Sequence, residues 1–272
     1  MNNYEFCARW VLDQRAGAGN DIRVLDYGCG TGKIVKELRS HGIEAFGCDV
    51  FYEGGHSSTD SQAIITADVI KEKRIEYPDG VIREMKTSDI PFKDNFFDFV
   101  INNQVMEHVE NLDVVLREIS RVLKPGGIVL SLFPDKSVWR EGHSGVIFLH
   151  WFPKGSRFAI LYAAILRFFG FGFHKNIRGN FHFARVLCDW LDKWTYYRSS
   201  TEIRDTYSKY FSETKHIEDY WLRTRYESRF PFLAWIPARL QRLIVNKLGG
   251  LVFTARNKDI SLDDPALSAT VS

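Results

Sequence analysis

The sequence predicts an α/β protein with a doubly wound, mostly parallel sheet. Apolar stretches typical of buried strands alternate with amphipathic stretches of helical period through residue 133. A glycine-rich turn separates the first such strand from a helix, and a second strand follows, which describes a βαβ unit. The chain has 272 residues, of which 45% are hydrophobic and 26% are charged. This composition excludes disordered, collagen-like and coiled-coil proteins.

The first four expected elements come from apolar spacing and turn residues. Residues 3–14 place large apolar side chains at helical spacing, and a Gly/Ala run ends this helix. A compact apolar strand at 22–27 enters the glycine cluster. A helix at 33–40 points its apolar residues inward, and a second strand at 44–50 follows it.

The alternation continues with three further strands. We expect a short helix near 63–71 and then strands at 81–86, 97–102 and 127–133. Between the last two strands, residues 112–123 place apolar side chains on one face and end at a Pro-Gly-Gly turn, which predicts an amphipathic helix.

The alternation breaks after residue 133. Residues 134–198 interleave aromatic and basic side chains without a clear strand, so we expect an inserted lid or substrate-binding segment. Beyond it we expect, in order, a helix at 201–211, a strand at 215–226, a helix at 236–248 that buries Ile236, Leu240, Leu243 and Ile244, and a closing strand at 250–256. Residues 259–272 are expected to form a flexible tail.

Charge and aromatic residues are unevenly distributed along the chain. The net charge is +2, yet residues 1–133 carry 15 basic and 21 acidic residues, whereas residues 134–248 carry 19 and 10. The same two segments hold 13 and 25 of the 39 aromatic residues. An acidic front half is thus followed by a basic, aromatic-rich half, which indicates an anionic or apolar partner for the latter.

Cysteine usage and hydropathy bear on the compartment. The four cysteines show neither paired nor metal-ligand spacing, which fits a reducing compartment and predicts no metal site. No basic start followed by an apolar run precedes residue 20, so we expect no signal peptide. The longest apolar stretch, 158–173, contains Arg167 and falls short of the ~20 residues that span a bilayer. We expect a cytoplasmic protein, either soluble or peripheral at the inner membrane face.

The segment VLDYGCGTG carries the clearest chemical signal. Gly28, Gly30 and Gly32 stand at alternate positions between a strand and a helix, where they let the backbone turn sharply and approach a ligand. A dinucleotide fingerprint fails because Lys33 stands in place of its third glycine. A P-loop fails because Ile34 stands in place of the required Ser or Thr.

Two carboxylates narrow the choice of ligand. Asp26 lies on the first strand beside the loop, which favours a ligand with positive charge over a bare pyrophosphate. Asp49 ends the second strand about 20 residues beyond the loop, where a carboxylate can accept both hydroxyls of a ribose. Together they describe an adenosine with a zwitterionic, cationic tail.

Several segments, in order, resemble those of class I S-adenosylmethionine-dependent methyltransferases of the small-molecule type. They are VLDYGCGTG, GCDV, SDIPFKDNFFDFV, NNQVMEHV and LREISRVLKPGGIVLSLFP. The resemblance covers residues 22–133 closely and resumes at 200–256. It implies a seven-stranded Rossmann-like sheet of order 3-2-1-4-5-7-6 with the last strand antiparallel. It also implies S-adenosyl-L-methionine as cofactor and a methyltransferase core formed by residues 1–133 and 199–258.

The resemblance further implies roles for single residues. The methionine part of the cofactor would lie at the glycine loop and the ribose on the carboxylate that ends the second strand. The implied cofactor-binding residues are Asp26, Gly28, Gly30, Thr31, Gly32, Asp49, Val50, Asn102 and Gln104. One position departs from the family. Lys86 stands where an acidic residue often contacts adenine, so we expect that contact from Thr87, Ser88 or Asp89.

Methyl transfer from a sulfonium is an in-line displacement, so catalysis rests on positioning and, for a hydroxyl acceptor, on removal of a proton. No metal is needed in principle. The candidate bases are His108, His143 and His150, each of which could instead be an ordinary polar residue of the pocket wall or lid. The Asn/Asp-Pro-Pro-aromatic run typical of adenine or glutamine N-methylation is absent, and Asn102-Asn103-Gln104 occupies its place.

The basic, aromatic insertion admits three roles. It could be a buried lid, a surface that docks on an anionic membrane to reach a lipid-linked acceptor, or a nucleic-acid-binding segment. Nucleic acid is least favoured because no recognised RNA-binding module accompanies it. We predict an S-adenosylmethionine-dependent methyltransferase that acts at oxygen on a small-molecule, glycan or lipid-like acceptor. The alternatives are a non-catalytic S-adenosylmethionine-binding accessory protein and an RNA or other nucleic-acid methyltransferase.

Overall fold

The computed structural model describes residues 1–15, 21–50, 80–85 and 89–258. Together these residues form a seven-stranded sheet with the predicted order β3-β2-β1-β4-β5-β7-β6. Strands β1 to β5 pair in parallel, and β7 runs antiparallel to both of its neighbours. The strands are β1 (Arg23–Tyr27), β2 (Glu44–Asp49), β3 (Ile82–Glu84), β4 (Phe97–Asn103), β5 (Leu123–Phe133), β6 (Phe211–His216) and β7 (Leu251–Asn257).

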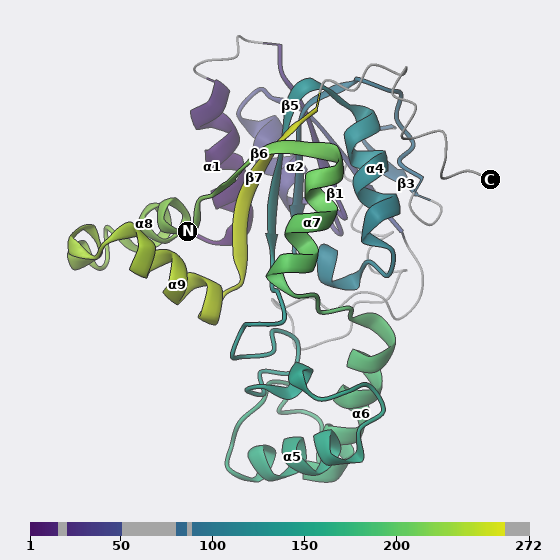
Figure 1. Ribbon diagram of the computed structural model, residues 1–272, viewed down its shortest axis with the longest axis vertical. Helices are drawn as coiled ribbons and strands as arrows, with labels where there is room; N and C mark the ends of the chain where they lie inside the picture. The colour runs from purple at the N-terminus through teal and green to yellow at the C-terminus, as the bar shows by residue number, and fades with distance from the viewer. Residues whose placement is uncertain (16–20, 51–79, 86–88, 259–272) are drawn as a thin grey trace.

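Helices cover both faces of this sheet, which makes three layers (Figure 1). Apolar side chains of α4 and α7 pack with one face of the strands, and those of α1, α2, α8 and α9 pack with the other. These helices are α1 (Asn3–Arg15), α2 (Lys33–Ser40), α4 (Leu112–Val122), α7 (Ser200–Tyr210), α8 (Glu218–Tyr226) and α9 (Ala238–Leu248). The doubly wound fold is therefore confirmed.

The segment between β5 and α7 forms a helical insertion with its own hydrophobic cluster. It contains η3 (Leu149–Trp151), α5 (Arg157–Phe168) and α6 (Asn180–Trp194), and helix α5 begins where Ser156 accepts a hydrogen bond from the Ala159 amide. Buried side chains from η3, α5 and α6 pack together, among them Leu149, Ala163, Phe183 and Leu187. The insertion lies beyond the end of β5 (Figure 1), on the side where ligands bind in such sheets.

The prediction of a strand at 215–226 is wrong. The strand of this region is β6, and residues from Glu218 onward form helix α8. Strand β6 lies at the edge of the sheet and buries only Phe211, so its sequence lacks the alternation that marks a half-buried strand. Acidic residues in the first turn of α8 and arginines in the last turn complement the helix dipole.

The inward face predicted for the helix at 236–248 is also wrong. Leu240, Leu243 and Ile244 are exposed, whereas Gln241 and Val245 of α9 are buried. The buried Gln241 amide donates to the carbonyls of Leu233 and Ile236 and so ties α9 to the preceding η4 (Pro231–Trp235). The polar Gln241 is thus buried, whereas the neighbouring apolar residues that hydrophobicity predicted to be buried are exposed.

The helix expected near 63–71 and the tail at 259–272 lie outside the described residues. Among the helices that the structure does describe, none combines the length and the apolar character required to cross a bilayer.

Candidate active site

The glycine loop joins β1 to α2 in a strongly turned conformation. Gly28, Gly30 and Gly32 have φ angles of 71°, 51° and 77°, in the left-handed region that favours glycine. The amides of Gly28 and Cys29 both donate to the Cys48 carbonyl, at 2.8 and 3.1 Å, which fastens the loop to the end of β2. The sequence therefore predicted both the loop and the reason for its glycines.

Two of these glycines face different surroundings. A Cβ atom built on Gly28 would lie 2.5 and 2.6 Å from the two methyl carbons of Val105, so the chain itself fills that side. A Cβ atom on Gly30 would meet no described atom within 4 Å. At Gly30 the described residues therefore leave open space beside the loop.

Two buried carboxylates lie at the same end of the sheet. Asp49 Oδ2 accepts a hydrogen bond of 2.6 Å from the Gly30 amide, so the loop and the end of β2 are directly connected. The pKa of Asp26 is raised well above its usual range, first by burial and then by the negative charge of Asp49. A cationic group bound beside these carboxylates would offset their repulsion, as the sequence analysis expected of the ligand.

The remaining predicted cofactor residues lie around this loop or at the end of β4. Thr31 and Val50 are half-buried. Asn102 is fully buried and its amide donates to Ser131 Oγ at 2.9 Å, whereas its Oδ1 accepts no hydrogen bond from the described residues. Gln104 has a φ of 59° and donates through its backbone amide to Leu132. Among the described residues, the oxygen of Asn102 is thus a buried acceptor without a hydrogen-bond partner.

Of the three residues proposed to contact adenine, only Asp89 lies among the described residues. Ser88 lies outside the described residues, as does Thr87. Asp89 is exposed and lines a hollow of about 490 Å³ that also includes Arg83 and Arg121. Contact of Ser88 or Asp89 with adenine stays a prediction.

The structure brings the first two candidate histidines together. His108 lies in η2 (Met106–His108) after β4, and His143 lies in the insertion, yet their Nε2 atoms are 3.2 Å apart. His143 Nδ1 contacts Glu141 Oε1 at 2.7 Å, and both residues are buried. The negative charge of Glu141 raises the pKa of His143 despite its burial, so the imidazolium form is favoured.

Three further residues complete this cluster and were not predicted from the sequence, namely Glu107, Glu141 and Tyr197. Tyr197 donates a 2.7 Å hydrogen bond to Glu141 Oε1. Glu107 is 1% exposed, and neither of its carboxylate oxygens accepts a hydrogen bond from another described residue. The Glu-His pair at 107–108 and the Glu-Gly-His run at 141–143 were visible in the sequence, but nothing local indicated that they meet.

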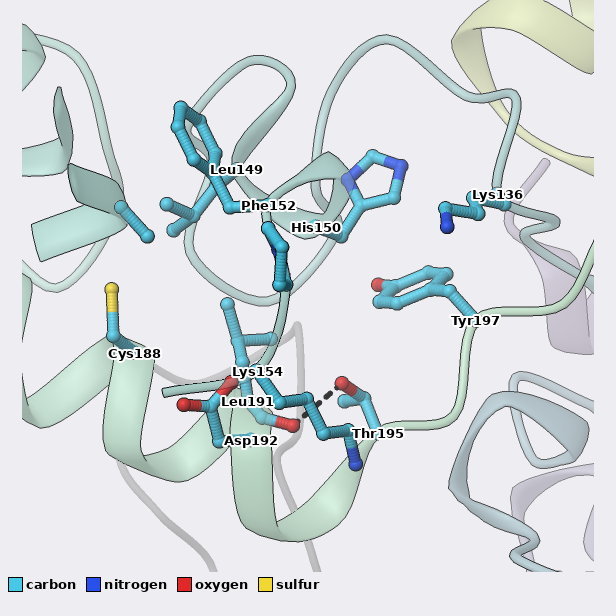
Figure 2. A pocket seen from close by; sticks show the side chains of 12 residues that line it. Lys136, Leu149, His150, Phe152, Lys154, Cys188, Leu191, Asp192, Thr195 and Tyr197 are labelled. Atoms are coloured by element: carbon cyan, nitrogen blue, oxygen red, sulfur yellow. Dashed lines mark hydrogen bonds between the residues drawn. The ribbon is translucent and has the colours of Figure 1, made fainter. Parts of the chain in front are cut away.

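A pocket of about 190 Å³ lies in the insertion beside this cluster, and Figure 2 shows its lining. Leu149, Phe152 and Leu191 line its apolar part. His150 and Tyr197 lie together in its wall, with ring centroids 4.5 Å apart. Burial lowers the pKa of His150, an effect that the charge of Glu141 opposes, so its ring remains neutral near pH 7. Tyr197 joins the pocket to Glu141.

Comparisons with known proteins agree with this geometry. Residues 25–131 match the family model described as a methyltransferase domain. A crystal structure of an S-adenosylmethionine-dependent methyltransferase from Mesorhizobium loti superposes with a TM-score of 0.51 at 15% identity, covering 93% of this chain and 100% of that one. The sheet order and the glycine loop thus define an α/β protein of the methyltransferase fold. Residues 25–131 therefore form a methyltransferase domain, in agreement with the resemblance to class I S-adenosylmethionine-dependent methyltransferases.

Curated relatives match about half of this chain at low sequence identity. The chain is 24% identical over 156 residues to a ubiquinone biosynthesis O-methyltransferase of Mesorhizobium japonicum, covering 56% of this chain and 58% of that protein. It is 32% identical over 133 residues to a malonyl-[acyl-carrier protein] O-methyltransferase of Erwinia pyrifoliae, covering 46% of this chain and 41% of that protein. The chain therefore spans about half the length of these relatives.

Proposed function

We propose that this chain is an S-adenosylmethionine-dependent methyltransferase that methylates a hydroxyl of a small or lipid-like acceptor. The observation that carries the proposal is the glycine loop with the buried carboxylates of Asp26 and Asp49 beside it, and with open space at Gly30. A nucleoside with a cationic tail suits these groups better than a pyrophosphate, which would meet two negative charges.

The residues present fit this cofactor. Asp49 would accept the ribose hydroxyls, Val50 would pack on adenine, and the unpartnered Asn102 oxygen would accept a donor from the methionine end. When bound, the cofactor supplies an electrophilic methyl group on its sulfonium. A cation in the loop would favour the charged form of the buried Asp26 carboxyl, and the turned backbone would let the cofactor approach closely.

The insertion pocket supports an acceptor with an apolar part and a polar end. Its apolar lining is followed by the polar groups of Lys136, His150 and Tyr197. His150 is the best-suited base, because its lowered pKa keeps it neutral and able to accept a proton. His143 is less suited, since Glu141 favours its protonated form.

Oxygen as the acceptor atom is supported by two observations. The two curated relatives named above are both O-methyltransferases by name. A hydroxyl acceptor also needs a base, which His150 would provide within the pocket. An assay with methyl-labelled S-adenosylmethionine against fractionated lipids, glycans and small metabolites tests the proposal. Label should enter an acceptor fraction with equimolar release of S-adenosylhomocysteine; binding of the cofactor without turnover on any fraction would favour the accessory protein instead.

We further propose that the insertion docks on an anionic membrane through α5. Large apolar side chains on one side of this helix are exposed at helical spacing, namely Phe158, Leu161, Ile165 and Phe168. Exposed basic residues flank them, including Lys154, Arg157, Lys175, Arg178 and Arg185. Figure 1 shows α5 at the end of the molecule farthest from the sheet. An amphipathic helix with basic neighbours suits an anionic lipid interface.

Co-sedimentation with vesicles tests this docking. Vesicles that contain phosphatidylglycerol should bind the chain in a salt-sensitive way, whereas pure phosphatidylcholine vesicles should not. The double variant Phe158→Glu/Phe168→Glu should lose binding. Phe232→Glu, which changes an exposed phenylalanine of η4 far along the chain, serves as the matched control and should keep it. Equal sedimentation of both variants would refute docking through α5.

A further inference from the structure

The cluster beside the pocket contains three potential metal ligands. Ligand atoms of Glu107, His108 and His143 all lie within 4.8 Å of one another. They come from η2 and from the insertion, so they meet only when the insertion packs on the end of β4. Glu107 is almost completely buried and, among the described residues, accepts no hydrogen bond from a neighbour. A buried carboxylate with no such partner is costly unless a cation or proton accompanies it.

The hydrogen bonds of the two imidazoles fix which nitrogen faces the cluster. His108 Nδ1 lies 2.7 Å from the Trp194 carbonyl, which can only accept, so Nδ1 carries the proton. His143 Nδ1 lies 2.7 Å from the carboxylate of Glu141 and donates to it in the same way. In both neutral rings the lone pair is therefore on Nε2. The two Nε2 atoms point into one small region, where their lone pairs repel each other unless a proton or a metal cation lies between them.

This arrangement matches the outer shell of protein metal sites. A metal-binding histidine usually donates its other N–H to a carboxylate or a backbone carbonyl, which orients the ring. Here Glu141 and the Trp194 carbonyl fill those roles, and Tyr197 in turn donates to Glu141. The two rings are thus already held in the tautomer that binds a metal.

The distance between the two nitrogens also suits a shared ion. Nitrogens at ~2.05 Å from one ion and at the tetrahedral angle lie about 3.3 Å apart. The two Nε2 atoms are 3.2 Å apart. Either a metal ion or a proton shared between the two nitrogens would account for this separation, and the experiment below distinguishes the two.

We propose that Glu107, His108 and His143 bind a divalent transition metal ion, with Zn²⁺ as the best match. Imidazole nitrogens with one carboxylate are ligands that zinc accepts, whereas magnesium and calcium prefer sites made of oxygen. The ion would also balance the charge of two buried carboxylates, Glu107 and Glu141. Three protein ligands leave a fourth position open, as in catalytic rather than structural zinc sites.

The open position gives the ion a role that rests on the proposed function. The cluster shares Tyr197 with the insertion pocket through Glu141, so an acceptor in that pocket would lie near the ion. A hydroxyl or adjacent oxygen pair bound at the fourth position would lose its proton more easily, because a metal lowers the pKa of a bound hydroxyl. The acceptor class indicated is therefore one with a metal-binding oxygen, such as a catechol or an enol.

Zinc binding to the full, untagged chain tests the site directly. The protein is stripped with a chelator, dialysed and titrated with Zn²⁺ by calorimetry, and Co²⁺ is then used as a spectroscopic probe of coordination. We expect one equivalent of zinc and a tetrahedral Co²⁺ absorption spectrum. His143→Gln and Glu107→Gln should each weaken binding by at least ~100-fold, since loss of even an outer-shell partner costs about 10–100-fold. The exposed His182→Gln is the matched control and should bind like the wild type.

The outcomes separate the metal site from the proposed function. If either variant unfolds, Glu141→Gln replaces it, with an expected loss of about 10–100-fold. Unchanged zinc affinity in the cluster variants, or no uptake by the wild type beyond that of His143→Gln, would overturn the site and indicate a shared proton instead. S-adenosylmethionine affinity, measured on the same samples, should not change. If the wild type did not bind S-adenosylmethionine, the proposed function would be refuted while the zinc result stayed intact.

Discussion

Two neighbouring glycines of the loop should respond very differently to the same added methyl group. Gly28 and Gly30 both have positive φ, so Gly28→Ala and Gly30→Ala each incur the left-handed strain of an alanine, roughly 1–2 kcal/mol. Only at Gly28 does the new Cβ meet the chain, at 2.5 and 2.6 Å from the methyl carbons of Val105 and 3.1 Å from its Cβ. At Gly30 it enters space that the described residues leave open.

Both variants carry the same backbone strain, so the difference between their Tm values reports only the steric clash with Val105. Valine is stiff about χ1, so Val105 can yield only by moving its backbone. Overpacking of this kind costs about 1–3 kcal/mol. For a chain of this size, 1 kcal/mol shifts Tm by about 2–4 °C, so Gly28→Ala should melt about 2–12 °C below Gly30→Ala. Gly30→Ala should instead lose at least ~10-fold in S-adenosylmethionine affinity, equivalent to 1.4 kcal/mol.

Thermal unfolding and calorimetric titration of both variants provide the assay. The strain common to both alanines cancels, so the order of the two Tm values depends on Val105 alone. Equal Tm values would refute the packing argument. Wild-type cofactor affinity in Gly30→Ala would show that the ligand does not lie against Gly30.

Three further predictions concern stability. Tyr207→Phe removes a buried hydrogen bond between the phenol and Ser131 Oγ and should cost about 0.5–1.5 kcal/mol in chemical denaturation. Arg121→Met frees the carbonyls of Ile90 and Phe92, which Arg121 binds at 2.9 Å, and should cost about 1.5–3 kcal/mol. Burial alone would raise the pKa of Glu118, but Arg121 lowers it. The ionised Glu118 therefore stabilises the folded protein fully above the ordinary carboxyl pKa, and this contribution is lost as pH falls through the lowered pKa. Glu118→Gln removes the contribution and should flatten the acid side of a curve of Tm against pH.

The parts of the fold that follow from local pattern could be predicted from the sequence. The alternation of strands and helices and the glycine loop depend on apolar runs and turn residues that are contiguous in the chain. The sheet order came instead from the resemblance to the methyltransferase family. Strand β6 could not be predicted, because an edge strand with one buried residue shows no alternation. The buried face of α9 was missed because Gln241 is satisfied by carbonyls of η4, a partnership that hydrophobic periodicity does not contain.

The candidate site divides in the same way. The loop, Asp26 and Asp49 lie within a short stretch, and their types indicate the ligand's charge. The histidine cluster joins residues 35 positions apart, His108 and His143, and Tyr197 reaches Glu141 across 56 positions. Only the packing of the insertion on the sheet decides these contacts, so histidine could be proposed as a base from the sequence but its partners could not.

The central claim is that S-adenosylmethionine lies over the glycine loop with its ribose on Asp49. Calorimetric titration of S-adenosylmethionine into the wild type and into Asp49→Ala tests it most directly. Each hydrogen bond to a charged group contributes about 1.5–3 kcal/mol, so losing two ribose contacts should weaken binding by at least ~100-fold. A folded Asp49→Ala protein that binds the cofactor with wild-type affinity would contradict the site and, with it, the proposed function.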